Sequence, residues 1–215
     1  MKRLLAFCIA MLAAPSSSFA QVELSFYTGV QSAQPSDVSI RDPLSLPVNA
    51  RLNWQGRSFD APLYYGLRAT SWRSGSFGVG LDFAHNKIYP SSLPDGYDVL
   101  EMTDGLNTLT VNAYRRWDGV FGDVTPYVGG GIGIAVPHVE VTNDISQTSG
   151  YQLTGPAATL IAGASLPIND QWSVFGEYNG TYSTNTAELD SGGTLETDIA
   201  TNALNVGVSF NLLRR

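Results

Sequence analysis

The residues most able to do chemistry are two histidines and a group of carboxylates in the polar stretches of the chain. His85 ends the segment LDFAHNK, and His138 lies in AVPHVEV with Glu140 two residues later. The carboxylates crowd GYDVLEMTDGLN and AELDSGGTLETDI, and they are Asp98, Glu101, Asp104, Glu188, Asp190, Glu196 and Asp198. Imidazole nitrogens and carboxylate oxygens suit divalent metals and iron. The set could form a metal site, and the simpler interpretation of these residues taken alone is a solvated acidic surface.

Basic residues are few in the same stretches, and other catalytic motifs are missing. Arg41, Arg51, Arg57 and Lys87 could contact phosphates or acidic sugars, or serve only as surface charges. The sequence has no G-x-S-x-G, H-E-x-x-H or P-loop motif, and the run VGGGIG belongs to a strand pattern, not to a strand-to-helix turn. Serines in the same stretches leave a serine hydrolase conceivable, but their spacing singles none out.

The N-terminus predicts export. MKRLLAFCIAMLAAPSSSFAQ has the basic start, apolar run and small-x-small end of a signal peptide, with cleavage expected after Ala20. The only cysteine, Cys8, lies in this segment, so the exported protein should contain no thiol or disulfide. Of 12 basic residues, two also lie there, which leaves 10 against 19 acidic residues. Such an acidic chain disfavours nucleic acid as a partner.

The rest of the chain, residues 21–215, alternates apolar and polar residues in eight segments. ALNVGVSFNL, at the C-terminus, is the clearest example. The segments cover residues 22–30, 63–70, 77–83, 108–113, 128–136, 157–166, 172–183 and 203–212. The connections alternate between short turns and long polar stretches, the latter being Ser32–Ala61, Ile88–Gly105, Pro137–Gly155 and Thr184–Ala200. Charged residues make up only 14% of the chain, against about 25% in soluble domains.

This pattern predicts an all-β fold, an eight-stranded antiparallel transmembrane β-barrel with short periplasmic turns and four longer extracellular loops. A soluble β-sandwich or lipocalin-like barrel is the competing fold, and it would place charge outside. In the transmembrane barrel the apolar stripes face lipid. The lumen is filled by side chains, including the charges Glu23, Arg68, Asp82 and Glu177, which must pair when buried. Function is then expected at the loop end.

Aromatic residues near the predicted strand ends suggest girdles at the two membrane interfaces. The girdle on the turn side would contain Trp72, Phe77, Trp117 and Trp172, and that on the loop side Phe26, Tyr65, Phe83 and Tyr182.

Several stretches taken together resemble the lipid A oxidase family of bacterial outer membranes. The informative motifs are VLEMTDGLN, VPHVEV and GGTLETDI, and weaker likeness extends over nearly all of the exported chain. The resemblance implies an outer-membrane enzyme that uses molecular oxygen to oxidise the proximal glucosamine of lipid A to an aminogluconate unit, with release of hydrogen peroxide. Its substrate needs a free anomeric hydroxyl, so lipid A without its 1-phosphate is expected. The partners are then the outer membrane and its lipopolysaccharide.

The roles of single residues are assigned from chemistry and predicted position. Oxidation of a sugar by oxygen generally needs a metal or an organic cofactor. We therefore expect a divalent metal ion held by His85, His138, Glu140 and Asp104, with Glu101 or Glu196 as the base. Arg51, Arg57 and Lys87 are the expected substrate-binding cations. We expect a monomer. The alternatives are a non-enzymatic barrel, such as an adhesin or membrane-stabilising protein, and a lipid A deacylase.

Overall fold

The computed structural model describes residues 21–43, 45–73 and 76–212, without the side chains of residues 103 and 104. The expected signal peptide, residues 1–20, therefore lies outside the described residues, and so does the side chain of Asp104. Within the described ranges, no helix is long and apolar enough to cross a membrane.

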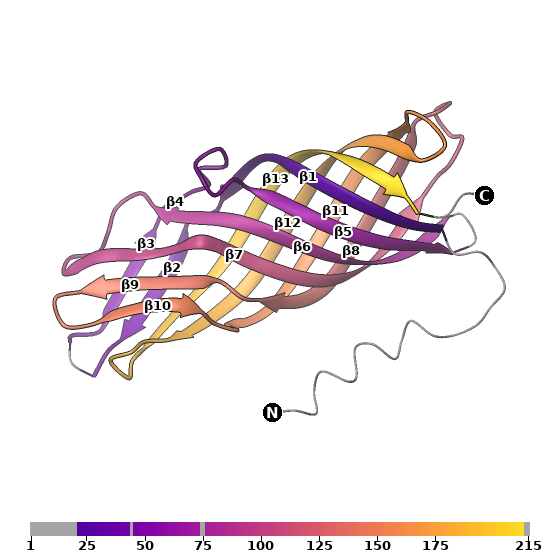
Figure 1. Cartoon of the computed structure of the whole chain (residues 1–215). Helices are drawn as coiled ribbons and strands as arrows, with labels where there is room; N and C mark the ends of the chain where they lie inside the picture. Colours follow the sequence, from indigo (N-terminus) through magenta and orange to yellow (C-terminus); the bar gives the residue numbers. More distant parts are fainter. Residues whose placement is uncertain (1–20, 44, 74–75, 213–215) are drawn as a thin grey trace, which may run out of the picture.

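Eight antiparallel strands form a closed ring of hydrogen bonds, as the sequence predicts (Figure 1). Going round the ring, each strand pairs with the next, and the pairing of β13 with β1 closes it. The ring strands are β1 (Gln21–Ala33), β5 (Tyr65–Arg73), β6 (Phe77–Pro90), β7 (Tyr97–Arg116), β8 (Thr125–Ala135), β11 (Gly155–Pro167), β12 (Trp172–Glu188) and β13 (Thr194–Asn211).

The outer surface of the ring carries a broad apolar band. Ile132, Leu160 and Val206 keep 75%, 72% and 65% of their surface exposed. Alternate residues of the same strands are buried in the lumen, as Ser209 and Asn205 are on β13. A water-soluble protein rarely exposes apolar patches of this extent, whereas a barrel that crosses a bilayer must present one to lipid.

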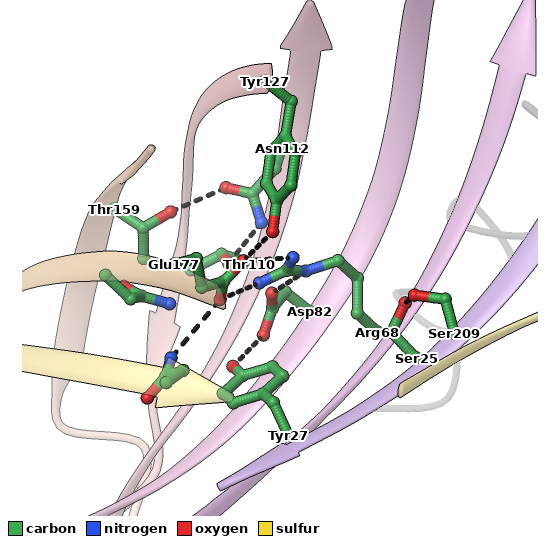
Figure 2. Close-up of polar contacts among 12 residues, drawn as sticks. Ser25, Tyr27, Arg68, Asp82, Thr110, Asn112, Tyr127, Thr159, Glu177 and Ser209 are labelled. Carbon is green, nitrogen blue, oxygen red and sulfur yellow. Dashed lines mark hydrogen bonds and ion pairs between the residues drawn. The ribbon is translucent and has the colours of Figure 1, made fainter. Parts of the chain in front are cut away.

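A polar network fills the lumen inside this band (Figure 2). The guanidinium of Arg68 donates from Nε to Asp82 at 2.5 Å and from Nη1 and Nη2 to Glu177 at 2.8 Å. The hydroxyl of Tyr27 donates to Asp82 and that of Tyr127 to Glu177, each at 2.7 Å. These contacts compensate the desolvation of three buried charges.

The turn-side end of the lumen shows that one predicted girdle residue was placed wrongly. Trp72 points inward and is only 7% exposed, with the Arg116 guanidinium 4.2 Å from its ring centroid. It lines a small cavity together with Glu23. Trp72 follows Arg68 by four residues, and in a strand an even spacing puts two side chains on the same face. The other three turn-side aromatics, Phe77, Trp117 and Trp172, are exposed.

At the loop end, the predicted long connections consist largely of further strand. They contain β2 (Ser36–Arg41), β3 (Val48–Leu52), β4 (Trp54–Gln55), β9 (His138–Asn143) and β10 (Gln147–Tyr151). β6, β7, β12 and β13 also run on beyond the apolar band, and all these elements lie at one end of the barrel (Figure 1). Only short connections remain between them, such as residues 91–96 and 189–193.

These extensions enclose a second core, which we call the loop-end core. On β13, Leu195 and Ile199 point into it while Glu196 and Asp198 face outward. The alternation is thus inverted relative to the membrane band, because here water covers the outer surface. The core contains Ala33, Val38, Ile40, Leu52, Trp54, Ile88, Tyr97, Leu100, Met102, Leu106, Ala135, Val139, Val141, Ala187, Leu189, Leu195 and Ile199. Since apolar side chains fill this end, its polar and charged side chains lie on the outer surface.

Candidate functional site

Most of the predicted site residues lie on the outside of three neighbouring strands, a surface we call the β6–β7–β9 face. It comprises His85, Lys87 and Tyr89 on β6, Glu101 on β7, and His138 and Glu140 on β9. Alternation fixes their direction, because the residues on either side of Glu101 and of Glu140 point into the loop-end core. The strands are held in place by the pairing of β7 with both β6 and β9.

Two carboxylates face each other at the centre of this face. Glu101 lies directly opposite Glu140 in the β7–β9 pairing. Like charges in such a position destabilise a sheet, so the arrangement is unusual for a purely structural surface. Partial burial raises the pKa of Glu101, the negative charge of Glu140 raises it further, and the positive charge of Arg57 partly offsets both. A carboxylate with a raised pKa is a stronger base, which suits proton transfer.

His85 lies at the edge of the β6–β7–β9 face nearest the membrane, and several contacts fix its ring. It is 6% exposed, and its Nδ1 lies 2.8 Å from Oδ1 of Asn107. The ring of Tyr65 stacks on it at 5.2 Å between centroids. Gly105 has φ +91°, and a Cβ there would come within 2.4 Å of Nδ1, so the close approach requires glycine. Nε2 of His85 is buried and has no hydrogen-bond partner among the described residues.

Lys87 lies under a segment that bulges from the barrel wall beside β4 and β5 (Figure 1). The lysine is 0% exposed, and its Nζ donates to the carbonyl oxygen of Asp60 at 2.6 Å. The ring of Tyr89 lies 5.2 Å from Nζ of Lys87 and 4.6 Å from Cζ of Arg57. Two of the three predicted substrate-binding cations therefore share one aromatic ring, and Arg57 is the exposed one.

Three of the four predicted metal ligands, His85, His138 and Glu140, share the face but are not gathered at one point, and the side chain of Asp104 is not described. His85 lies opposite Asn107 and Glu140 opposite Glu101. β7 bulges between these two partners, because Ile88 pairs with Met102, and along the regular strand β6 the separation amounts to about four residues, or about 13 Å. The ring of His138 packs edge-on against Tyr151, and its buried Nδ1 lacks a hydrogen-bond partner in the described part of the chain. Among described side chains, no three of the residue types His, Cys, Asp and Glu cluster to hold a metal. We derive no step through a metal.

Glu196 and Arg51 lie elsewhere, in a groove between the β2–β3 hairpin and the outer faces of β12 and β13. The groove has a volume of about 650 Å³. Arg51 pairs with Asp37 at 3.1 Å, and the hydroxyl of Tyr182 donates to Asp198 at 2.8 Å. The predicted alternative base is therefore remote from the Glu101–Glu140 pair.

Sequence reasoning missed two residues that position the site, Asn107 and Tyr89. Asn107 lies on the same face of β7 as the lipid-facing residues Leu109 and Val111, because each is two residues from the next. A polar side chain in that series was a detectable signal that the outer face has another role there.

The fold places the chain among known membrane proteins. It matches the family described as outer membrane protein β-barrel domain over residues 4–211. The chain belongs to this family. Its membrane is therefore the outer membrane, and the apolar band is the surface that contacts the lipid. A search of curated proteins gives no match.

Solved members of similar fold share little sequence with the chain. Neisserial surface protein A superposes with a TM-score of 0.51 and 13% identity, over 92% of this chain and 100% of that one. The outer membrane protein AlkL, determined in lipid bilayers, gives 0.50 and 12%, over 94% and 97%. At such identities the likeness concerns the fold alone.

Proposed function

We propose that the chain oxidises the proximal glucosamine of lipid A in the outer leaflet, with molecular oxygen as the acceptor. The observation that carries this proposal is the pairing of Glu101 with Glu140 beside the Arg57 cation. These groups lie on the loop side of the lipid-facing band, and the sugars of an outer-leaflet glycolipid lie on the same side of the hydrocarbon. The motifs VLEMTDGLN and VPHVEV, which carry the resemblance to lipid A oxidases, contribute these carboxylates.

The reaction balances as follows. The anomeric carbon loses two electrons and two protons and becomes a lactone, while oxygen takes them up to form hydrogen peroxide. Water then opens the lactone to the aminogluconate, so the product gains one oxygen atom. Glu101 is the base that accepts the proton of the anomeric hydroxyl, and Arg57 binds an anionic group of the same lipid.

A cofactor must carry the electrons from the sugar to oxygen. We keep a divalent metal ion as our proposal, bound at His85 or at His138, because each has a buried ring nitrogen without a hydrogen-bond partner in the described part of the chain, although the described side chains form no three-residue cluster there. Chelation of the purified protein tests it. Loss of oxidation that returns with one metal would support the proposal, and oxidation that survives exhaustive chelation would refute it.

Mass analysis of lipid A from cells with and without the protein tests the function. We expect a gain of one oxygen atom that depends on aeration. Glu101→Gln should abolish the gain, whereas Glu188→Gln, which changes an exposed carboxylate outside the site, should retain it. Loss of an acyl chain would instead identify a deacylase. Unchanged lipid A would favour a non-enzymatic barrel.

A further inference from the structure

The segment Gly56–Tyr64 fills a gap in the barrel wall. β5 begins at Tyr65, whereas its neighbours β1 and β6 continue beyond that level. The segment is tied to β1 by two hydrogen bonds shorter than 3 Å: the backbone N of Gln31 donates to Oγ of Ser58 at 2.8 Å, and Oγ1 of Thr28 donates to O of Tyr64 at 2.7 Å. It therefore covers the outside of β6, including the buried Lys87.

The outward side of this segment is mostly apolar. Phe59 is 70% exposed and Leu63 53% exposed, and Ala61, Pro62 and the charged Asp60 between them are also exposed. Two large apolar side chains on a bulge are costly in water and favourable in hydrocarbon.

The height of the segment relative to the membrane follows from its contacts. Its two hydrogen bonds to β1 lie on either side of Val30, which faces outward and is 51% exposed. Directly after the segment, the ring of Tyr65 packs against Phe26 and Phe83, two residues of the predicted loop-side girdle. The apolar side of the segment is thus continuous with the lipid-facing band.

Arg57, at the start of the same segment, lies next to the Glu101–Glu140 pair. Its charge acts on Glu101, and its guanidinium rests on the ring of Tyr89. Its backbone has φ +35°, an uncommon conformation for a residue with a side chain. One short segment thus carries two exposed apolar side chains and a cation next to the proposed site. A glycolipid presents its acyl chains and its anionic headgroup in the same order.

We propose that the segment Gly56–Tyr64 is a glycolipid-binding arm embedded in the outer leaflet, in which Phe59 and Leu63 contact acyl chains and Arg57 binds an anionic group of the headgroup. The embedding does not depend on the proposed oxidation, whereas the use of the arm to seat the substrate rests on it. Because Lys87 is covered by the arm, Arg57 is the cation that meets the lipid.

Spin labelling in vesicles that contain lipid A tests the embedding. The sequence has one cysteine, Cys8, so single labels can be introduced as Phe59→Cys or Leu63→Cys in a Cys8→Ser background. Leu204→Cys reports the lipid-facing wall, and Leu46→Cys, 86% exposed between β2 and β3, reports water. We expect the labels at 59 and 63 to be accessible to oxygen like that at 204. Accessibility to a water-soluble nickel chelate like that at 46 would overturn the proposal.

Binding of lipid A to the detergent-solubilised protein tests the role of Arg57. We expect Arg57→Gln to weaken the affinity about tenfold or more, since a charge-assisted hydrogen bond is lost. Arg73→Gln, a change of an exposed arginine at the turn end of β5, should leave it unchanged. Equal affinities of the Arg57→Gln and wild-type proteins would refute the headgroup contact. Embedded labels together with unoxidised lipid A would reject the proposed oxidation and leave the arm intact.

Discussion

One guanidinium is the shared counter-ion of two carboxylates in the membrane-spanning lumen. Arg68 forms buried contacts with both Asp82 and Glu177, and its side chain is 5% exposed. Burial of a charge is tolerated only when it is paired and hydrogen-bonded. Each member of the network is therefore required by the others.

Replacement of Arg68 should destabilise the barrel. Arg68→Leu leaves two carboxylates buried without a counter-ion, and we expect it to lower the free energy of unfolding by about 3–5 kcal/mol. Urea unfolding in lipid vesicles measures the loss. Arg115→Leu, a change outside the network, serves as the control and should shift stability by about 0.5 kcal/mol at most. Equal stabilities of the two variants would show that the network is dispensable.

The Glu101–Glu140 pair predicts how pH affects oxidation. A base works unprotonated, so the rate should rise with pH through the raised pKa of Glu101. Glu140→Gln removes one cause of the elevated pKa, and the acid limb of the rate profile should move to lower pH. Arg57→Gln removes the charge that lowers this pKa, and the limb should move to higher pH. Shifts in the same direction for both variants would exclude Glu101 as the base.

For single residues, the alternation of side chains along a strand predicted whether they face the lumen only where the sequence had identified the strand. Glu23, Arg68, Asp82 and Glu177 line the lumen at the positions that alternation gives them. The prediction that Trp72 belongs to the girdle rested on its residue type and its place near a strand end. Its spacing of four residues from Arg68 already predicted that its side chain faces the lumen. The opposition of Glu101 and Glu140 could not be predicted, since it depends on a strand pairing within two predicted loops.

At the scale of elements, β12 and β13 change their inside and outside chemistry as they leave the membrane. The stretch LETDI places Leu195 and Ile199 in the loop-end core and Glu196 and Asp198 outside. Its period of two was present in the sequence. Because this stretch carries charges, its sequence predicts a solvated loop. The expectation of apolar residues outside and polar residues inside applies only where lipid surrounds the barrel.

This inversion predicts that neighbouring residues of the β12–β13 hairpin respond differently to substitution. Leu195→Ala opens a cavity in the loop-end core and should cost about 2–5 kcal/mol of local stability, whereas Thr194→Ala should cost little. Protease treatment of intact cells measures the difference, because cleavage tracks the population of the open hairpin. We expect cleavage of the Leu195→Ala hairpin to be at least about tenfold faster. Equal cleavage of the two variants would argue against a packed loop-end core.

At the scale of the whole molecule, the polar lumen network and the loop-end core follow one another along the barrel axis. Together they fill the interior with side chains, so the lipid substrate of the proposed reaction would reach the β6–β7–β9 face from the side, by diffusion within the outer leaflet. The arm at Gly56–Tyr64 lies at that point of entry, with its apolar side toward lipid and Arg57 toward the carboxylates. The fold thus links membrane contact to the proposed chemistry on one side of the barrel.

The most direct test of the account is turnover by the purified protein. The folded barrel would be placed in vesicles with lipid A that lacks its 1-phosphate, and supplied with oxygen and with divalent metals or iron. We predict one hydrogen peroxide for each aminogluconate formed, with the added oxygen atom of the product coming from labelled water. Lipid A that stays unchanged under these conditions, on a barrel shown to be folded, would contradict the proposed function.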